Sequence, residues 1–403
     1  MLKVLLNPIV IIAALGYFVD IYDLLIFSMV RVPSLKEIGF AGRELAFGGT
    51  LANIQMTGLV LGGIFFGILG DKRGRLSVLF GSIILYSLAN FLNGYATTFT
   101  EFCFLRFFAG FGLAGELGAG ITLVTEVLSP QLRGYGTMMV ATVGMSGALV
   151  ASQIVQHFDW RLAYKIGGML GFLLLLMRVS VSESELFKSV EKKSGVRRGN
   201  FFDLFNDKSR FKRFAYCVVV GLPIWFSLGI LAAYSPEFAK QLELPEPVTA
   251  AKVLFYCYIG FVSGDFASGL LSQVIRSRKR AIQIFVLLNL VSTLFFLFGL
   301  HHASMEAFYV ISALLGFTGG YWAVVVTLAA EQFGTNMRST VATTVPNFIR
   351  FGLVGMNSIF LMLKSDLGMV GSAIAVGSVV MICSLLASTQ LSETFGKNLD
   401  FHE

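Results

Sequence analysis

The stretch Gly67-Ile-Leu-Gly-Asp-Lys-Arg-Gly-Arg75 decides how the rest of the chain is interpreted, because it places four charges within five residues. It lies between two long apolar runs, at about 47–69 and 77–98. A short, highly charged turn between two hydrophobic segments is not expected inside the core of a water-soluble protein, but it is typical of a loop at the surface of a membrane. The stretch therefore predicts two membrane-spanning helices joined by a charged hairpin.

Composition extends this interpretation to the whole chain. The 403 residues are 55% hydrophobic and only 14% charged, with a mean hydropathy of +0.75, whereas soluble proteins are about 25% charged. At about 20 residues per span, the length accommodates about twelve spans, with no interruption as large as a soluble domain. We predict an all-α membrane protein with twelve transmembrane helices, centred near residues 20, 58, 88, 115, 146, 170, 224, 263, 290, 318, 351 and 379.

The net charge of +7 reflects topology rather than nucleic-acid binding. If the N-terminus is cytoplasmic, the loops on that side hold the basic clusters at 72–75, 178–213 and 276–280, while the opposite loops hold scattered bases. This asymmetry follows the positive-inside rule. We expect both termini in the cytoplasm, contact of the basic loops with the lipid bilayer, and no nucleic-acid partner. The compact loops favour a bacterial inner membrane.

Two segments recur along the chain, which indicates an internal duplication typical of transporters. Glu126–Arg133 places an acid and an arginine seven residues apart at the end of the fourth predicted helix, and Glu331–Arg338 repeats this at the end of the tenth. The charged hairpin recurs at Gly269–Arg278, where Gln273 replaces the acid. The two halves are therefore predicted to form two pseudo-symmetric six-helix bundles.

A change of composition separates the halves. From about residue 180, Ser, Glu, Lys, Arg and Gly replace the apolar run. We predict an N-terminal six-helix bundle at 1–179, a cytoplasmic linker at 180–212, a C-terminal six-helix bundle at 213–390 and a cytoplasmic tail at 391–403.

The hairpin also carries a resemblance to a known family. It matches the pattern G-x-L-x-D-x-x-G-R of the Major Facilitator Superfamily at Gly67, Leu69, Asp71, Gly74 and Arg75. The C-terminal stretch 392–400 is similar to the E-T-x-G-x-x-L-E tail of the sugar-porter branch. The resemblance spans nearly the whole chain and implies a secondary active transporter, not an enzyme, in which two bundles rock about a site near the middle of the bilayer.

Six charged side chains fall inside predicted spans, where a charge costs about 2.5 to 3.5 kcal/mol. In the resembling family, helices 1, 4, 7 and 10 line a central cavity and helices 2, 5, 8 and 11 flank it. All six charges lie on helices of these two groups, as expected if they border a wet cavity. They are Asp20, Asp23, Arg106, Glu116, Asp265 and Arg350.

Asp20 and Asp23 share one helix face with about 4.5 Å of axial rise between them. A carboxyl group that takes a proton from one side and releases it to the other is the minimum chemistry of a proton-coupled carrier. The segment resembles the first helix of proton-coupled porters, and Arg106 begins a match to the family pattern R-x-x-x-G-x-G. The resemblance implies that Arg106 partners Asp23. Glu116 is either a second proton site or a hydrogen-bond partner inside the bundle.

Arg350 follows Asn347 by three residues on one helix face, and a guanidinium reads carboxylate or phosphate with two hydrogen bonds. We interpret Arg350 as a clamp for an anionic substrate; the alternative is a structural ion pair with Asp265 or another acid. Further residues that either line the cavity with Asn347 or simply pack are Tyr22, Gln55, Gln153, Trp225, Tyr321 and Trp322.

A second set of charges lies at the predicted inner membrane edge. Pairing of these charges across helix ends would latch the two bundles, with about 0.2 to 1 kcal/mol for each exposed pair. Anchoring by the positive-inside rule alone explains the arginines but not the matched acids. The predicted cytoplasmic gate comprises Asp71, Arg75, Glu126, Arg133, Glu331 and Arg338.

The leading functional hypothesis is proton-coupled symport of a small polar or anionic metabolite by alternating access. Alternatives within transport are a neutral sugar or polyol symporter and a drug:proton antiporter. The alternatives from other classes, a membrane-embedded enzyme, a non-transporting membrane sensor and a channel, are disfavoured: the chain has no sequence motif of an enzyme, its linker is too short for the signalling domain of a sensor, and the duplicated halves with matched charge pairs favour alternating access over a channel. We expect a monomer whose partners are its substrate, protons and lipid. We expect no cofactor and no metal site, because the four cysteines form no CxxC and the four histidines lie at outer edges or in the tail.

Overall fold

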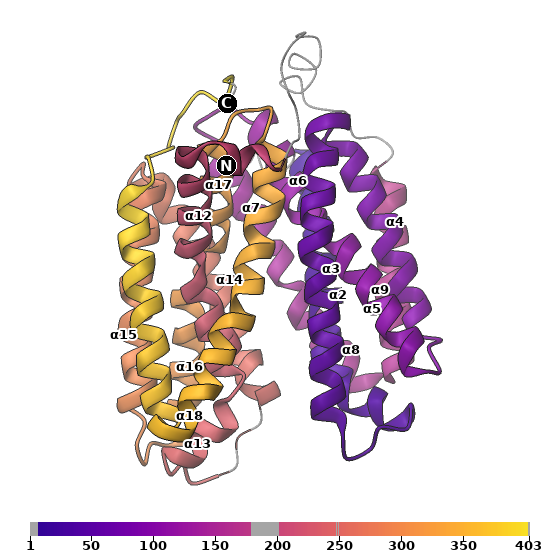
Figure 1. The fold of residues 1–403 in the computed structure, drawn as a ribbon, viewed down its shortest axis with the longest axis vertical. Coiled ribbons are helices and arrows are strands. Elements are labelled where there is room, and N and C mark those ends of the chain that lie inside the picture. The colour runs from indigo at the N-terminus through magenta and orange to yellow at the C-terminus, as the bar shows by residue number, and fades with distance from the viewer. Residues whose placement is uncertain (1–6, 179–200, 247, 249, 402–403) are drawn as a thin grey trace.

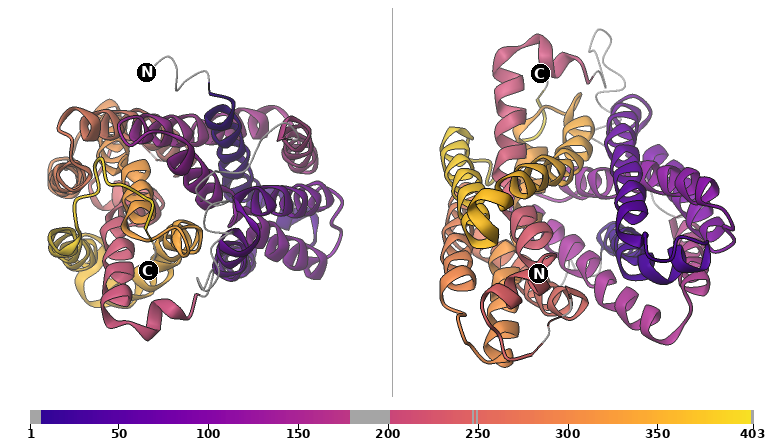
Figure 2. Two further views of the ribbon diagram at one scale, coloured as in Figure 1. Left: turned by 90° about the horizontal axis from the view of Figure 1, so that it is seen from above. Right: turned by 60° about the horizontal axis from the view of Figure 1, so that its bottom comes forward.

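The computed structural model describes residues 7–178, 201–246, 248 and 250–401, and every regular element within these ranges is a helix. The helices form two bundles that lie side by side (Figures 1 and 2). Residues 1–6 of the predicted first domain, 180–200 of the predicted linker and 402–403 of the predicted tail lie outside the described residues. Helical structure resumes within the predicted linker at α11 (Asp203–Asn206).

Each bundle is built from six spans, and some of these spans consist of two helices. The N-terminal bundle contains α2 (Pro8–Glu37), α3 (Glu44–Arg73), α4 (Arg75–Asn93), α5 (Phe99–Leu113) with α6 (Glu116–Val127), α7 (Arg133–Met145) with α8 (Gly147–His157), and α9 (Trp160–Met177). The C-terminal bundle contains α12 (Lys208–Phe226) with the π-helix η2 (Ser227–Ala232) and α13 (Ser235–Gln241), α14 (Ala250–Val274), α15 (Arg278–Phe298), α16 (Met305–Gly319) with α17 (Trp322–Gln332), and α18 (Arg338–Gln390).

Twelve spans result from this arrangement. Eleven helical segments of the described chain are long and apolar enough to cross a membrane. The last segment, α18, has 53 residues and contains two helices, because the backbone leaves the helical conformation at Gly368 with φ 67°. A positive φ suits glycine, which has no Cβ. The predicted twelve-helix membrane fold is confirmed.

Short polar residues begin many of the spans by capping their first N–H groups. Thr98 and Glu101 form a capping box at α5, and the side chains of Asp159, Ser277 and Ser304 each accept a hydrogen bond from the first turn of the next helix. These residues lie in the short loops between consecutive helices. The hydropathy pattern and the caps together fix where each helix begins.

Four spans break near their middle. The breaks lie at Ala114–Gly115, at Ser146, at the π-helix η2 and at Gly320–Tyr321. Irregular backbone at membrane depth is tolerated only where protein buries it or where it lines a cavity. A Cβ on Gly320 would lie 2.5 Å from the backbone nitrogen of Asp265, so the break in the tenth span needs a glycine to let α14 approach. Met145, Leu228 and Trp322, beside three of these breaks, line one central cavity.

The two bundles make close contact at one end, which we call the linker end. It contains the segments 67–75, 126–133, 276–280 and 331–338. Two glycines let the backbones of the two bundles approach closely. A Cβ added to Gly67 would lie 2.8 Å from Cα of Thr340, and a Cβ added to Gly118 would lie 2.3 Å from Cα of Thr343. The bundles are therefore closed on each other at the linker end.

Candidate functional site

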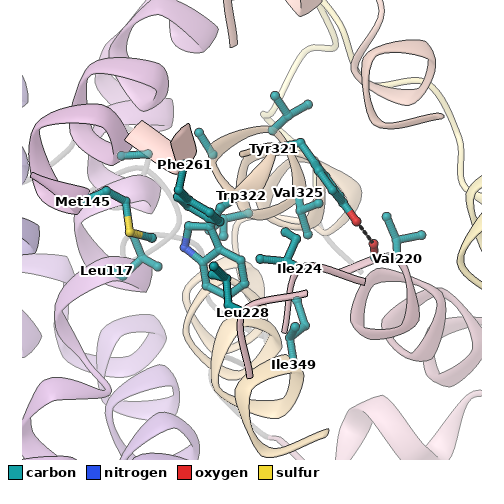
Figure 3. Close-up of a cluster of buried hydrophobic side chains, with 14 of the residues drawn as sticks. Leu117, Met145, Val220, Ile224, Leu228, Phe261, Tyr321, Trp322, Val325 and Ile349 are labelled. Carbon is teal, nitrogen blue, oxygen red and sulfur yellow. Dashed lines mark hydrogen bonds between the residues drawn. The ribbon is translucent and has the colours of Figure 1, made fainter. Parts of the chain in front are cut away.

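A cavity with about 290 Å³ of space free of protein atoms lies between the two bundles. Arg350 contributes the single charged side chain among its lining residues, and the walls are otherwise aromatic and aliphatic. Figure 3 shows Trp322 at the centre of this region, with Phe261 and Leu228 from its own bundle and Met145 from the other. The lining is completed by Ile21, Leu24, Ile224, Trp225 and Tyr258.

Arg350 is buried and held by weak contacts. Its Nη1 donates to Oδ1 of Asn347 over 3.3 Å, its charged centre lies 5.6 Å from the ring centroid of Trp322, and its Nη2 lies 4.0 Å from Oδ2 of Asp20. Asp20 belongs to the first span, so this ion pair joins the two bundles. Contacts this long leave donor capacity that a carboxylate in the cavity can use.

Asp20 and Asn347 link Arg350 to the N-terminal bundle. The Asp20 carboxylate is fully buried and accepts no hydrogen bond from the described residues. The Asn347 side chain donates to the carbonyl of Ala114 over 3.2 Å, at the break in the fourth span. Movement of Arg350 would therefore alter contacts with the N-terminal bundle through two side chains, Asp20 and Asn347.

The predicted partners Asp23 and Arg106 are neighbours without direct contact. Within the described chain, no cation lies within 4.0 Å of the Asp23 carboxylate. Asn90 accepts a hydrogen bond from Arg106 Nη1 over 3.2 Å and also neighbours Asp23. The Arg106 guanidinium lies 5.1 Å from the ring centroid of Phe27, so aromatic contact replaces a salt bridge.

Glu116 lies inside the N-terminal bundle, away from the cavity lining. It forms a buried ion pair with Arg178, and Ser82 donates to it over 3.4 Å. Arg178 also donates to the carbonyl of Leu79, and the missing side chain of Gly16 makes room for the pair. The sequence analysis places Arg178 in the basic cluster at 178–213 and gives it no partner. The signal that could have placed it is its position directly after an apolar run, where an arginine needs a partner.

Asp265 caps a broken helix. Its Oδ1 accepts a hydrogen bond from the backbone N–H of Ala323 over 2.9 Å, in the first turn of α17. A carboxylate at a helix N-terminus satisfies unpaired N–H groups and complements the helix dipole. Asp265 therefore holds the start of α17, and with it Trp322, against the cavity. Arg350 does not pair with Asp265; the acid that it contacts is Asp20, which agrees with the predicted alternative of an ion pair with another acid.

Two substitutions at Asp265 distinguish a cap from a group that must carry charge. Asp265→Asn keeps an oxygen acceptor, so we expect its thermal unfolding midpoint to stay within about 1 °C of the parent protein. Asp265→Ala removes the cap, which costs about 0.5 to 2 kcal/mol and lowers the midpoint of this 403-residue chain by about 1–2 °C, more than Asp265→Asn does. Scanning fluorimetry of purified protein, with tryptophan emission as a second readout, measures both. Equal loss in both variants would contradict the capping role.

Five of the residues predicted to line the cavity do not line it: Asn347, which contacts Arg350 instead, and Tyr22, Tyr321, Gln55 and Gln153. The Tyr22 hydroxyl donates to Ala163 within its own bundle, and the Tyr321 hydroxyl donates to Val220, pointing away from Trp322 (Figure 3). Gln55 packs on Gly110, and Gln153 is exposed. The sequence does not show which face of each helix turns toward the cavity, so the direction of these side chains could not be predicted. By contrast, Trp225, Trp322 and Arg350 do line the cavity.

Two aromatic residues of the cavity were missed by the sequence analysis. Tyr258 and Phe261 both belong to α14 and line the cavity. They precede Asp265 by seven and four residues, which places all three on one helix face. That spacing from an intramembrane acid is the signal that could have identified them.

All six predicted gate residues lie together at the linker end, and Glu126 is the centre of the cluster. Its carboxylate lies 2.7 Å from Arg75 Nη2 and 3.0 Å from Nη1 of Arg338, which belongs to the other bundle. Asp71 accepts hydrogen bonds from the backbone N–H groups of Ser339 and Thr340. These contacts hold the start of α18 against the N-terminal bundle.

The internal duplication is visible in these contacts. Glu331 pairs with Arg278 over 3.4 Å, as Glu126 pairs with Arg75. The Gln273 side chain packs against Gly134 at the start of α7, and in the same way the Asp71 side chain binds the start of α18. The expectation of exposed pairs was wrong, because these groups are buried. Breaking a buried pair costs about 3 to 5 kcal/mol, much more than breaking an exposed one.

The tail adds contacts that the sequence analysis did not assign. Arg133 donates to the carbonyl of Lys397, and Glu393 accepts from the backbone N–H of Arg278 over 2.9 Å at the start of α15. Burial by itself raises the pKa of Glu393, but hydrogen bonds from Ser277 and from nearby N–H groups bring it below its usual value. Because the pKa is lower in the folded protein, this contact is complete above the unfolded pKa of about 4.3 and is lost as the pH falls through the folded pKa.

The described residues include one group that could hold a metal ion, Glu243 with His301 and His302. Their ligand atoms lie within 4.8 Å of one another. All three side chains are exposed at the end of the molecule opposite the linker end, away from the central cavity. Nothing in the cavity resembles a metal site, since its lining offers one guanidinium and apolar groups.

Comparisons with known proteins agree with this architecture. Residues 13–354 match the Major Facilitator Superfamily. The chain is 25% identical to the putative niacin/nicotinamide transporter NiaP of Bacillus subtilis, over 85% of this chain and 84% of that protein. It is 25% identical to the gentisate transporter of Corynebacterium glutamicum, over 92% and 84%. The structure of the proton:xylose symporter XylE covers 98% of this chain and 97% of its own, with a TM-score of 0.77 and 16% identity.

Proposed function

The chain belongs to the Major Facilitator Superfamily, and from this premise we propose that it carries small aromatic carboxylates across the membrane by proton-coupled symport. It is a multi-pass membrane transporter of metabolites and not an enzyme. The observation that carries the proposal is the central cavity, where one guanidinium lies among aromatic rings. We place the linker end and both termini in the cytoplasm of a bacterial cell, following the positive-inside rule, and propose a monomer.

The cavity lining fits a flat ring that bears one negative charge. Aromatic walls from Trp225, Trp322, Tyr258 and Phe261 offer offset or edge contacts to a ring, and Arg350 offers two parallel donors to a carboxylate. The space between these side chains is narrow in this conformation, so binding of a cargo requires them to move apart.

The relatives support the same class of cargo. Niacin and gentisate, which appear in the names of two relatives, are both flat rings with a carboxyl group. Few polar side chains line the cavity, whereas a sugar or polyol needs many hydrogen-bond partners. The guanidinium also repels cationic drugs. The cavity chemistry therefore favours an aromatic acid over the neutral sugar and drug alternatives.

Competition for Arg350 provides a route to proton coupling. Asp20 and the carboxylate of a cargo would compete for the same guanidinium, because Asp20 lies 4.0 Å from it across the interface. Protonation of Asp20 ends its attraction to Arg350 and leaves the guanidinium for the cargo. One proton would then enter with each cargo molecule. We assign Asp23, one helical turn along the first span from Asp20, the role of a second proton acceptor, with Asn90 and Arg106 as the polar neighbours that hold its surroundings in place.

The direction of access follows from where the bundles close. The linker end is sealed by buried ion pairs. Toward the opposite end, a groove with about 680 Å³ of free space runs between α2, α8 and α14, and Tyr258 lines both this groove and the cavity. We propose that cargo and protons enter through this groove, and that opening of the predicted gate at the linker end releases them.

Uptake into proteoliposomes tests the proposal. With the interior alkaline by one pH unit, a 1:1 symporter accumulates labelled nicotinate about tenfold, since one unit equals about 1.4 kcal/mol. An uncoupler should abolish the accumulation, and protein-free liposomes give the background from passive entry of the acid. Xylose and a cationic drug tested in parallel distinguish the alternative cargoes. Uptake that ignores the uncoupler would exclude proton coupling.

Asp20→Asn tests the competition itself. This variant has no carboxylate to compete for Arg350, so nicotinate should bind with similar affinity at pH 5.5 and 7.5, whereas binding to the parent protein should weaken as the pH rises. The variant should exchange nicotinate across the membrane without accumulating it. Asp23→Asn, measured beside it, should lose accumulation but keep the pH dependence of binding. Accumulation by both variants would contradict the assignment of the two acids.

A further inference from the structure

A basic groove lies at the linker end of the C-terminal bundle, outside the transport pathway. It has about 1160 Å³ of space free of protein atoms and lies between the start of α12, the end of α17 and the end of α18. The lining side chains that carry the argument are Lys208, Lys212, Arg213 and Tyr216 of α12, with Gln332 and Gln390 from the other two helices. We call this surface the α12 groove.

The charged side chains that line the groove, among the described residues, are all basic. Within the part of the chain that the structure describes, the lining contains three bases and no carboxylate, whereas Arg75 and Arg338 of the gate cluster both pair with Glu126. Lys208, Lys212 and Tyr216 follow one another at intervals of four residues, so they share one face of α12. The nearby carboxylate of Asp207 caps the helix by accepting from the N–H of Arg210 over 2.8 Å and does not line the groove. The positive end of the helix dipole adds to the same field.

Contacts between the lining residues hold the groove in shape, so it is more than a patch of surface lysines. Nη1 of Arg213 donates to the carbonyl of Gln332 over 2.9 Å, and its guanidinium lies 4.6 Å from the ring centroid of Phe333. The Gln332 side chain donates to the carbonyl of Ser392 over 2.6 Å. Three segments that are distant in sequence are thereby held together around the groove.

We propose that the α12 groove binds a phosphate group, and that in the membrane this is the headgroup of an anionic phospholipid. Basic pockets between spans on the cytoplasmic side attract such headgroups. Two exposed phenylalanines, Phe205 of α11 and Phe211 near the start of α12, lie with their ring centroids 5.4 Å apart. Exposed phenylalanines beside lysines suit the boundary between lipid headgroups and acyl chains. A soluble phosphate ester offers the same chemistry and is the other possible source.

Occupation of the groove would stabilise the closed linker end. Gln332 follows Glu331, and Ser392 precedes Glu393; both acids bind Arg278 at the start of α15. A bound phosphate would hold α12, α17 and the end of α18 together beside these contacts. The groove is therefore a site for regulation of the gate by lipid composition, distinct from the cargo site at Arg350.

Native mass spectrometry of the purified, delipidated full chain tests the proposal. Phosphatidylglycerol, phosphatidylcholine and inorganic phosphate are each titrated onto the parent protein and onto Lys208→Gln/Lys212→Gln. At about 1 kcal/mol per basic residue near the membrane surface, loss of two lysines should weaken phosphatidylglycerol binding about 30-fold. The matched control is Arg276→Gln/Arg280→Gln, which removes the same charge from the linker end outside the groove and should bind phosphatidylglycerol like the parent protein.

The outcomes separate the two sources of phosphate. Selective retention of phosphatidylglycerol by the parent and control proteins supports the lipid site. Displacement of phosphatidylglycerol by equimolar inorganic phosphate or glycerol phosphate supports the phosphate site and assigns it to a soluble ester. Equal binding by the lysine variant and the parent protein, or equal loss in the control, would overturn the proposal. A thermal unfolding midpoint unchanged by the substitutions shows that any loss of binding is not a folding defect.

Discussion

Arg350→Gln is expected to weaken binding of an aromatic carboxylate by at least about 30-fold. Arg350 is the single charge in the cavity lining, and truncating one partner of a buried charge pair costs about 2 to 5 kcal/mol, where each 1.4 kcal/mol is a factor of ten. The variant also leaves Asp20 buried without its cation. Equilibrium binding of labelled nicotinate to purified protein measures the loss, and proteoliposome uptake should fall to the background of empty liposomes.

Two controls make this result specific. Arg350→Lys keeps the charge but not the planar fork that binds a carboxylate with two hydrogen bonds, so its affinity should fall between those of the parent and Arg350→Gln. Lys364→Gln removes a charge from the exposed far end of the first helix of α18 and should leave binding unchanged. If Arg350→Gln binds nicotinate as tightly as the parent protein does, the cargo is not held by this guanidinium.

Glu126→Gln is expected to open the linker end. Glu126 accepts from Arg75 and from Arg338 across the bundle interface, and all three groups are buried. Removal of its charge leaves two buried guanidinium groups facing a neutral amide, and breaking such a network costs about 3 to 5 kcal/mol. A difference of that size between the closed and open states shifts their ratio by more than about 100-fold.

Hydrogen–deuterium exchange of peptides covering 335–345 and 395–401 measures the opening. Glu126→Gln should exchange these segments at least about tenfold faster, and it should reduce accumulation because the linker end no longer seals. Glu37→Gln is the matched control, since Glu37 pairs with Arg161 over 2.9 Å at the opposite end with both side chains partly exposed. An exposed pair contributes about 0.2 to 1 kcal/mol. Equal exchange in the two variants would show that Glu126 does not latch the gate.

The architecture was predictable because the bilayer constrains each segment of the chain independently of the others. In lipid every backbone polar group must be paired within the chain, so each apolar run of sufficient length becomes a helix. The predicted centres near 20, 58 and 88 fall inside α2, α3 and α4, and the remaining nine also fall inside spans. The recurrence of Glu126–Arg133 as Glu331–Arg338 likewise appears in the structure as matched ion pairs with Arg75 and Arg278.

The partners of the intramembrane charges were less predictable. Hydropathy shows that Asp20, Glu116 and Arg350 need partners, but a partner is chosen by helix rotation and by packing between bundles. Asp20 meets Arg350 from the other half, and Glu116 meets Arg178 at the end of the sixth span. Neither pair has a spacing that the sequence could have revealed, because its members lie on different helices.

The sequence by itself determined the membrane, the number of spans, the duplication and the residue types at the linker end, since each depends on runs and spacings along one chain. Only the tertiary structure decided which side chains surround the cavity and which acid faces Arg350. Those choices depend on how helices rotate and where they break, as at Gly320, where α17 starts under the cap of Asp265 and turns Trp322 toward the cavity. Contacts between distant segments are fixed by packing in three dimensions, and no single-chain pattern carries that information.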